Sequence, residues 1–213
     1  MIQERPAGSR TRSALLLADI SGYTGFLQGV ADAHRALVIE ADEPPRAYAM
    51  MSTLLDVIIT TLEPRFRLVK LEGDAVFATA PDAPGSVRGA DALDCLRACH
   101  ASFVERLVDA GSIWSCQCDS CSRVGSLDLK FVLHHGDVMV QRIAGSEELL
   151  GPDVNTVHRL LKNHVRELLG ARPYALITDA ALEALAIPDE GMTPITETYD
   201  QIPTIAAHVL PLE

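Results

Sequence analysis

The chain has 213 residues, a length typical of one globular domain of ordinary size. Hydrophobic residues make up 48% of it and charged residues 22%, which is the composition of a folded protein rather than a disordered one. The formal charge is −11, from 29 acidic and 18 basic residues. A chain this acidic repels the phosphates of nucleic acids and of anionic membranes, so the composition argues against nucleic-acid binding.

No apolar run approaches the roughly 20 residues that a membrane-spanning helix needs. Near the N-terminus, residues 14–18 are apolar, but Asp19 ends the run before it reaches the length of about 7–15 residues found in signal peptides. The five cysteines, an odd number, fit a reducing compartment better than a secreted disulfide framework. We therefore expect a cytoplasmic protein that makes no contact with membranes.

The chain begins with a polar, Arg-rich segment over residues 1–12, which predicts a flexible arm ahead of a single domain over residues 13–213. A break at Pro44-Pro45 separates the first strand from the first helix. Hydrophobic periodicity then predicts alternating strands and helices. The predicted strands are residues 13–19, 66–71, 75–80, 127–133, 138–143 and 174–178, with one or two more within 196–210. The predicted helices are residues 46–62, 87–108, 153–169 and 180–186, with a Cys- and Ser-rich loop over residues 111–125.

Two hairpins are predicted among these strands, one turning at residues 72–74 and the other at residues 135–137. The element order indicates an α+β fold, in which helices pack on an antiparallel sheet.

Two carboxylates lie where a predicted strand meets a turn. Asp19 ends the first strand, and Asp74 lies in the first hairpin turn. If the two strands are neighbours, these carboxylates converge at one end of the sheet, where a pair of carboxylates binds hard divalent cations. The simpler interpretation is that an aspartate beside a glycine or another small residue only forms a turn.

Four segments, in this order, resemble the signature motifs of class III nucleotidyl cyclases. Residues 16–24 read LLADISGYT, and residues 70–77 read KLEGDAVF. Residues 131–138 read FVLHHGDV, and residues 151–160 read GPDVNTVHRL. The amino-acid sequences of these segments are most similar to those of small stand-alone cyclase-like proteins. The resemblance implies a ferredoxin-like antiparallel sheet with helices packed on it.

The resemblance also implies a catalytic site. Asp19 and Asp74 match the two aspartates that hold two Mg²⁺ or Mn²⁺ ions in the family. Asn155 and Arg159 match the pair that positions the ribose and stabilises the phosphate in the transition state. The reaction is an in-line attack of the ribose 3′-oxygen on the α-phosphorus with loss of pyrophosphate, so stabilisation of charge dominates its catalysis.

Helical spacing agrees with part of this assignment. In the predicted helix over residues 153–169, Asn155, Arg159, Lys162 and Arg166 recur at i, i+4, i+7 and i+11 and form one polar stripe. Lys162 is therefore a further candidate contact for the triphosphate. The same stripe would also suit a solvated helix face.

Two residues are candidates for reading the base. Lys70 matches the lysine that contacts adenine N1 in adenylyl cyclases, where guanylyl cyclases have a glutamate. Glu148 falls at the position of its purine-binding partner, which is Asp or Thr in the family. The resemblance therefore implies ATP as substrate and cyclic AMP as product.

Class III sites form between two protomers, so the resemblance implies a homodimer. The metal-binding Asp19 and Asp74 would come from one chain, and Asn155 and Arg159 from the other. Residues 193–213 contain no Lys or Arg, although active cyclases usually supply a lysine from this region to the triphosphate. The alternative is therefore a catalytically inactive cyclase-homology domain that binds a nucleotide or a protein. A third hypothesis is metal-dependent phosphoryl chemistry on another nucleotide.

Three thiols lie within six residues in the Cys-rich loop. Cys116, Cys118 and Cys121 form the pattern C-x-C-x-x-C, which predicts a structural zinc site that lacks its fourth ligand. Cys99 or His100, near the end of the preceding helix, is the expected fourth ligand, unless the partner subunit supplies it. A redox-active or merely exposed thiol cluster is the alternative.

His134 and His135 flank the second predicted turn and have no nucleophile pattern nearby, so no catalytic role is assigned to them. His34, His158 and His164 are expected at the surface or outside the first layer of the site.

Overall fold

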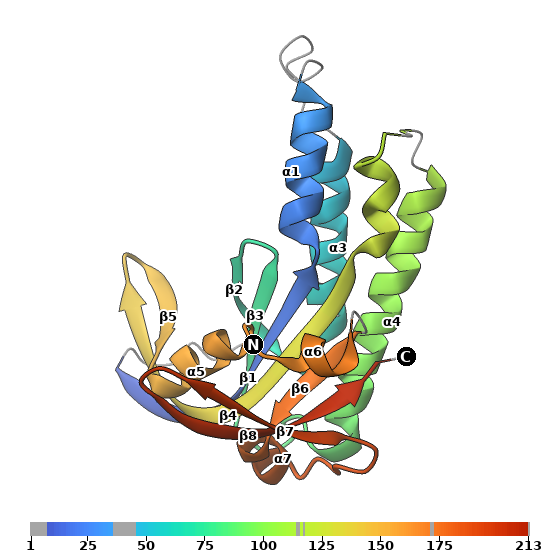
Figure 1. Ribbon diagram of the computed structural model, residues 1–213. Helices are drawn as coiled ribbons and strands as arrows, with labels where there is room; N and C mark the ends of the chain where they lie inside the picture. The colour runs from blue at the N-terminus through green and yellow to red at the C-terminus, as the bar shows by residue number, and fades with distance from the viewer. Residues whose placement is uncertain (1–7, 36–45, 114–115, 117, 171–172, 213) are drawn as a thin grey trace.

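The computed structural model describes residues 8–35, 46–113, 116, 118–170 and 173–212 (Figure 1). The predicted break at Pro44-Pro45 and residues 1–7 of the predicted arm lie outside this part of the chain.

The centre of the molecule is an eight-stranded sheet with the order β2-β3-β1-β4-β6-β8-β7, in which β5 also pairs with β4. β4 and β6 are parallel, and the other pairs are antiparallel, so the predicted antiparallel sheet is confirmed except at this one pair. The strands are β1 (Ser9–Ser21), β2 (Arg67–Glu72), β3 (Ala75–Pro81), β4 (Asp128–Ile143), β5 (Ser146–Leu150), β6 (Tyr174–Thr178), β7 (Thr193–Tyr199) and β8 (Ile202–Pro211).

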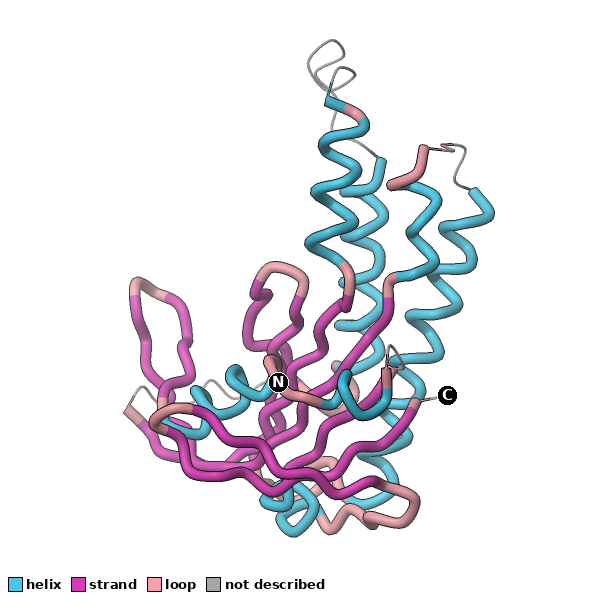
Figure 2. The backbone as a smooth tube through the Cα atoms, in the orientation of Figure 1, coloured by secondary structure: helices cyan, strands magenta, loops and turns pink. Residues whose placement is uncertain are grey.

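Helices cover both faces of the sheet unequally. Three long helices and a 3-10 turn lie together and extend beyond the end of the strands, as Figure 2 shows, whereas the other face carries short helices. The long helices are α1 (Tyr23–Ala33), α3 (Arg46–Leu62) and α4 (Gly89–Ile113), and the 3-10 turn is η1 (Cys121–Ser126). The short helices on that other face are α5 (Pro152–Leu160) and α6 (Val165–Leu169), whereas α7 (Asp179–Leu185) packs Ala181 and Leu185 into the larger apolar cluster on the face of the long helices.

The alternation of side chains along β1 explains why there are two cores. Leu16 and Ile20 point to the face of the long helices and belong to the larger apolar cluster. Leu15 and Leu17 point to the opposite face, where they pack with residues of α5 such as Val157. All of these side chains are buried, which is why β1 is apolar throughout its centre.

Three elements extend beyond what hydrophobic patterning predicts. β1 begins at Ser9, inside the segment that predicts an arm, because Ser9–Arg12 pairs with β4. α1 covers a stretch for which the pattern predicts no element. α4 continues to Ile113, so the first residues of the Cys-rich loop are helical.

The second predicted hairpin is wrong. β4 passes through residues 135–137 without turning and forms one strand of 16 residues. The hairpin lies further along, between β4 and β5, where Ala144 and Gly145 take positive φ angles of 51° and 88°. Gly136 has a different purpose: a Cβ there would lie 2.2 Å from Cγ of Asp153, so only glycine allows the N-terminus of α5 to approach β4.

The helix predicted over residues 153–169 is two helices. Asn163 separates them: its amide donates to the Leu160 carbonyl (2.6 Å), and its side-chain oxygen accepts from the Val165 N–H (3.0 Å). These bonds satisfy backbone groups that the end of α5 and the start of α6 leave open. Arg166 therefore lies on α6, and the predicted polar stripe is wrong beyond α5.

Candidate functional site

The ends of β1 and β3 bring the two acidic turns together. β1 and β3 pair antiparallel, with Asp19 opposite Ala75, the residue that follows Asp74. The Ile20 N–H donates to the Asp74 carbonyl at 3.4 Å. The expectation that Asp19 and Asp74 meet at one end of the sheet is therefore confirmed, because β1 pairs with β3.

A lysine that the sequence analysis did not single out lies at this position. Lys130 on β4 is directly opposite Asp19 in the strand register, and its Nζ lies 3.0 Å from Asp19 Oδ2. The same ammonium donates to the Leu161 carbonyl at the end of α5 (3.2 Å). Both charged side chains are at most one-fifth exposed, so this ion pair is shielded from water more than an ordinary surface pair.

The electrostatics of the two carboxylates favour a cation. Partial burial raises the pKa of Asp74, and repulsion from Asp19 raises it further, while Lys130 works in the opposite direction. Asp74 therefore holds its negative charge against an unfavourable environment. A divalent cation between Asp19 and Asp74 would remove that cost, and carboxylate oxygens are the ligands that Mg²⁺ and Mn²⁺ prefer.

The candidate base-reading residues also meet in the structure. Lys70 on β2 lies 3.3 Å from Glu148 on β5 and 3.2 Å from Glu72. Partial burial works to lower the pKa of Lys70, but hydrogen bonds to Glu72 and Glu148 outweigh it and raise the pKa. Lys70 is thus a charged donor held between two carboxylates.

Glu72 links this pair to α5. Its second carboxylate oxygen lies 2.9 Å from Nε2 of His158, whose other ring nitrogen contacts the Val154 carbonyl at 2.6 Å. The His158 ring also packs edge-on against Phe77, with ring centroids 5.0 Å apart. His158, expected at the surface or outside the first layer, therefore connects the helix of Asn155 to the strand of Lys70.

Asn155 and Arg159 lie exposed on α5. Lys162 follows the end of α5 and is also exposed, and its N–H donates to the Arg159 carbonyl (3.0 Å). Among the residues that the structure describes, neither Arg159 nor Lys162 has an ion-pair partner. Both cations are thus free to bind an anion, but the structure does not bring them into contact with Asp19 or Asp74.

The C-terminal hairpin of β7 and β8 supplies no strong cation, because residues 193–213 contain no Lys or Arg. Its histidine, His208, pairs with Asp179 at 3.1 Å. Described cations near the candidate site include Lys70 on β2, Lys130 on β4 and Arg159 on α5.

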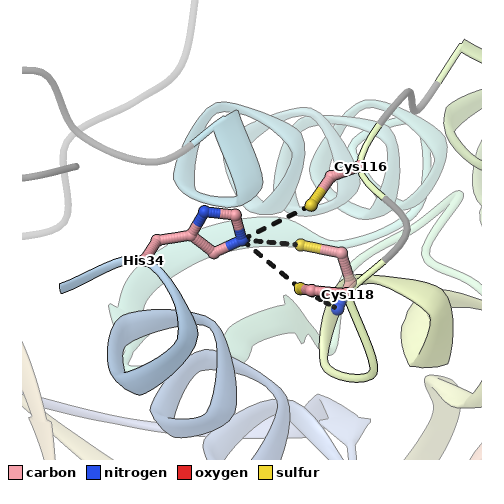
Figure 3. Close-up of side chains that lie close together, drawn as sticks. His34, Cys116 and Cys118 are labelled. Atoms are coloured by element: carbon pink, nitrogen blue, oxygen red, sulfur yellow. Dashed lines mark hydrogen bonds between the residues drawn. The ribbon is translucent and has the colours of Figure 1, made fainter. Parts of the chain in front are cut away.

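The three thiols of the Cys-rich loop converge on His34, the residue that follows the end of α1 (Figure 3). His34 Nε2 lies 3.6 Å from the sulfur of Cys116, 3.4 Å from that of Cys118 and 3.4 Å from that of Cys121. The four candidate ligand atoms all lie within 4.8 Å of one another. This arrangement of one imidazole and three thiols is able to hold a metal ion.

Neither expected fourth ligand takes part in this cluster. Cys99 is fully buried and its thiol contacts the Ile58 carbonyl at 3.9 Å, while His100 pairs with Asp128 at 3.4 Å. His34, expected at the surface or outside the first layer of the site, takes the place for which Cys99 or His100 was expected. The reason is tertiary: α1 packs beside η1, and no local spacing in the sequence relates position 34 to the three cysteines.

The thiols inside and outside the cluster differ in acidity. The Cys121 N–H donates to the Cys118 sulfur at 3.4 Å, and this bond is the main reason why the pKa of Cys118 falls to about 6. Burial instead raises the pKa of Cys99 well above its usual range. A low pKa favours the thiolate, the form that binds metals.

Lys130, Glu72 and His34 are the site residues that sequence reasoning missed. For Lys130 the only available signal was its place in a strand next to the one that carries Asp19, and that adjacency appears only once the sheet order is known.

In the part of the chain that the structure covers, no helix is long and apolar enough to cross a membrane.

Comparison with known proteins gives a family and a fold. A family model described as "Protein of unknown function (DUF2652)" matches residues 51–168. An uncharacterised protein of Mycobacterium tuberculosis (strain ATCC 25618 / H37Rv), Rv2561/Rv2562, is 34% identical over 166 residues, which cover 76% of this chain and 73% of that protein.

Solved structures of nucleotidyl cyclases resemble the whole chain. The adenylyl cyclase CyaB from P. aeruginosa superimposes with a TM-score of 0.67 and 12% identity, covering 96% of each chain. The guanylyl cyclase Cya2 superimposes with a TM-score of 0.63 and 16% identity, covering 96% of this chain and 93% of that one. Identities this low establish the fold alone. The chain therefore belongs to the DUF2652 family of proteins of unknown function, and its fold is that of class III adenylyl and guanylyl cyclase domains.

Proposed function

We propose that the protein is a class III nucleotidyl cyclase that converts ATP to cyclic AMP and pyrophosphate at a homodimer interface. One observation carries this proposal: Asp19 near the end of β1 and Asp74 just before β3 meet at one end of a cyclase-type sheet, and repulsion from Asp19 raises the pKa of Asp74. A turn that served only to reverse the chain would not need a second carboxylate beside it.

The site fits two Mg²⁺ or Mn²⁺ ions held by Asp19 and Asp74. When bound, such ions neutralise the phosphates and lower the pKa of the ribose 3′-hydroxyl that attacks the α-phosphorus. The chain itself contributes the fixed carboxylates, which the pairing of β1 with β3 holds in register. Fixed charges need no reorganisation during the reaction, and this preorganisation is the main source of catalysis in phosphoryl transfer.

Lys130 supports the proposal as a cation for the phosphates. Its Nζ ends a flexible four-carbon chain beside Asp19, so it reaches oxygens that bind at the acidic end of β1. Together with Arg159, which we assign to the transition-state phosphate, it supplies positive charge that the hairpin of β7 and β8 does not.

Base recognition follows from the Lys70–Glu148 pair. Lys70 would donate to adenine N1, and Glu148 would accept a hydrogen bond from the 6-amino group. Guanine presents the opposite pattern at these positions, with an N–H at N1 and a carbonyl at C6. Because Glu72 also holds Lys70 in place, the pair favours ATP over GTP.

A homodimer would complete the site. Asn155 and Arg159 are exposed on α5, away from contact with Asp19 and Asp74, and this fits a site that two chains share. Large apolar side chains are also exposed on the neighbouring strands, where a protein partner would cover them. They are Leu71 on β2 (48% exposed), Ile143 on β4 (51%) and Leu150 on β5 (45%).

A second candidate function is a nucleotide-binding or protein-binding module without turnover. The absence of Lys and Arg from residues 193–213 favours it, because the triphosphate then has fewer cations to bind its oxygens. The two functions share a fold and differ in whether product forms.

The direct test is product formation. Purified protein is incubated with ATP, GTP, CTP or UTP and Mn²⁺ or Mg²⁺, and cyclic nucleotides are identified by mass spectrometry. We expect cyclic AMP from the wild type and from Asp91→Asn, an exposed control on α4, but not from Asp74→Asn. No cyclic product from any nucleotide, with a folded protein that still binds ATP, would favour the binding module.

Mixing two inactive variants tests the shared site. Asp74→Asn and Arg159→Ala each disable both sites of their own homodimer, but a mixed dimer keeps one site with neither change. After unfolding and refolding together, we expect about a quarter of the wild-type rate, because half of the dimers are mixed and each has one intact site of two. An active wild type with no recovery in the mixture would place the whole site within one chain.

A further inference from the structure

We propose that His34, Cys116, Cys118 and Cys121 bind one structural zinc ion, which ties the end of α1 to the Cys-rich loop and the start of η1. This proposal does not depend on the cyclase proposal, because the four residues lie outside the acidic site.

The distances fit a tetrahedral ion. Zinc binds sulfur at about 2.3 Å and imidazole nitrogen at about 2.0–2.1 Å, so a tetrahedral angle places a nitrogen ligand about 3.6 Å from each sulfur. His34 Nε2 lies 3.4–3.6 Å from all three sulfurs. A disulfide between two of the cysteines would leave one sulfur unmatched and would not explain why all three lie equally close to one ring nitrogen.

The chemistry of the ligands selects zinc over the ions of the acidic site. Three thiols and one imidazole are the ligand set of closed structural zinc sites, whereas Mg²⁺ and Mn²⁺ prefer oxygen. Four protein ligands fill all positions of a tetrahedral ion and leave none for a substrate. Cys121 is 2% exposed, and Cys116 and Cys118 are half-buried against the larger apolar cluster, so the site is also shielded.

The packing around the cluster requires α1 and η1 to stay close. A Cβ at Gly29 on α1 would lie 2.8 Å from Oγ of Ser120 and 3.3 Å from its Cβ, so the helix and the loop lie in close contact at this point. Ser120 lies within the Cys-rich loop, between Cys118 and Cys121. The contact therefore holds the thiols at the distance from α1 that His34 needs.

The zinc would join segments that are far apart in the sequence. His34 and Cys116 are separated by 82 positions, and a cross-link across such a long stretch restricts the unfolded chain strongly. Both joined segments lead to the acidic site: α1 begins just after the strand of Asp19, and η1 ends just before β4, which carries Lys130. Near that site they touch again, where a Cβ at Gly22 would lie 3.5 Å from Leu127.

Counting the metal tests the proposal. The full chain is produced with added zinc, purified under reducing conditions and analysed by inductively coupled plasma mass spectrometry. We expect one zinc per chain in the wild type and in three controls, Cys99→Ala, His100→Ala and Asp74→Asn. We expect less than a tenth of that in His34→Ala and Cys118→Ala. Zinc retained by His34→Ala, or lost from Cys99→Ala or His100→Ala to the same degree, would overturn the assignment of His34.

A variant that exchanges one ligand for another tests the proposal if His34→Ala does not fold. His34→Cys should keep one zinc, since four thiolates also form a structural site. With Co²⁺ in place of zinc, the wild type should show strong thiolate-to-cobalt absorption and the visible bands of a tetrahedral ion. In His34→Cys the charge-transfer absorption should grow as a fourth thiolate is added. A weak spectrum typical of six oxygen ligands in the wild type, or identical spectra for both proteins, would contradict a His34–Cys116–Cys118–Cys121 site.

Discussion

Lys130 Nζ lies 3.0 Å from Asp19 Oδ2, and the two residues face each other directly across the antiparallel pair of β1 and β4. A cation is thus built into the acidic end of β1. It reduces the repulsion between Asp19 and Asp74, but it also competes with any divalent ion for Asp19. This competition makes Lys130 a sensitive probe of the proposed site.

Replacing Lys130 with methionine should have opposite effects on the two ligands. Mn²⁺ alone should bind several-fold more tightly, because its competitor for Asp19 is gone, while ATP should bind more weakly and turn over at least tenfold more slowly. The free energy of unfolding without ligands should fall by about 1.5–3 kcal/mol, the value of a hydrogen bond to a charged group. Calorimetric titration measures the Mn²⁺ and ATP affinities, product formation measures the turnover rate, and chemical unfolding measures the free energy of unfolding. Arg97→Met, which removes a cation from the surface of α4, should change none of them; weaker Mn²⁺ binding in Lys130→Met would contradict the competition.

Asp74→Asn should make the ligand-free protein more stable. The pKa of Asp74 is raised in the folded state, so its charged form costs stability once the pH exceeds the unfolded value of about 3.9 and passes the folded value. At pH 7 the gain from the substitution should be no more than about 1 kcal/mol, because the carboxylate is only half-buried. Thermal unfolding should also show that Mn²⁺ stabilises the wild type and not the variant. A variant that Mn²⁺ still stabilises equally would separate the metal from Asp74.

The buried carboxylate of Glu197 should give the fold a defined pH dependence. Glu197 is 1% exposed and accepts from the His164 N–H (2.8 Å), from His164 Nδ1 (2.9 Å) and from the Tyr199 hydroxyl (3.1 Å). The bond to Glu197 raises the pKa of His164, with a smaller effect from Glu167. A raised histidine pKa stabilises the fold fully below the unfolded value of about 6.5, and this contribution is lost as the pH rises through the folded value.

Glu197→Gln should therefore cost more stability at pH 6 than at pH 9. Urea unfolding of the wild type and the variant at both pH values measures the difference. In a His164→Gln background the cost of Glu197→Gln should become the same at both pH values. If it still varied with pH there, another group would be responsible.

Gly136→Ala should destabilise the fold by about 3 kcal/mol or more, the upper range for inserting a methyl group into a filled space. The new Cβ would lie 2.2–2.5 Å from three side-chain atoms of Asp153. Asp153 cannot simply move away, because it accepts from the Asp137 N–H (2.7 Å) and contacts His134 (3.3 Å). Adding Asp153→Ala should restore part of the loss measured by chemical unfolding. A substitution without effect would mean that α5 can shift away from β4.

Local patterns predict those elements that are determined locally. The helix over residues 46–62 has the predicted bounds because its apolar spacing lies between clear stop signals. Asp19 meets Asp74 because Asp19 lies near the end of an apolar strand and Asp74 lies in the turn before the strand that pairs with it. Gly136 misled the prediction, since a glycine beside an aspartate is typical of a turn. Here the glycine is required because the Asp153 side chain, which is close in space and distant in sequence, leaves no room for a Cβ.

The candidate metal cluster shows the same limit. Three of its residues share one short segment and can be found by spacing, whereas His34 follows a helix that lies beside this segment only in the folded protein. The break between α5 and α6 is likewise set partly from outside, because Glu197 on β7 accepts from the His164 N–H. Sequence reasoning finds such residues only when the sheet order and the helix packing are already known.

The unbroken course of β4 restricts how the length of this protein can vary among its relatives. Lys130 and Val132 point to the face of α5, and Phe131 and Leu133 point to the face of the long helices. One residue inserted or deleted between Lys130 and Gly136 would exchange these faces for the rest of the strand. Side chains of the two apolar cores would then change places, and Gly136 would no longer lie opposite Asp153. Insertions are therefore expected only beyond the ends of β4, in the Cys-rich loop or in the turn at Ala144 and Gly145.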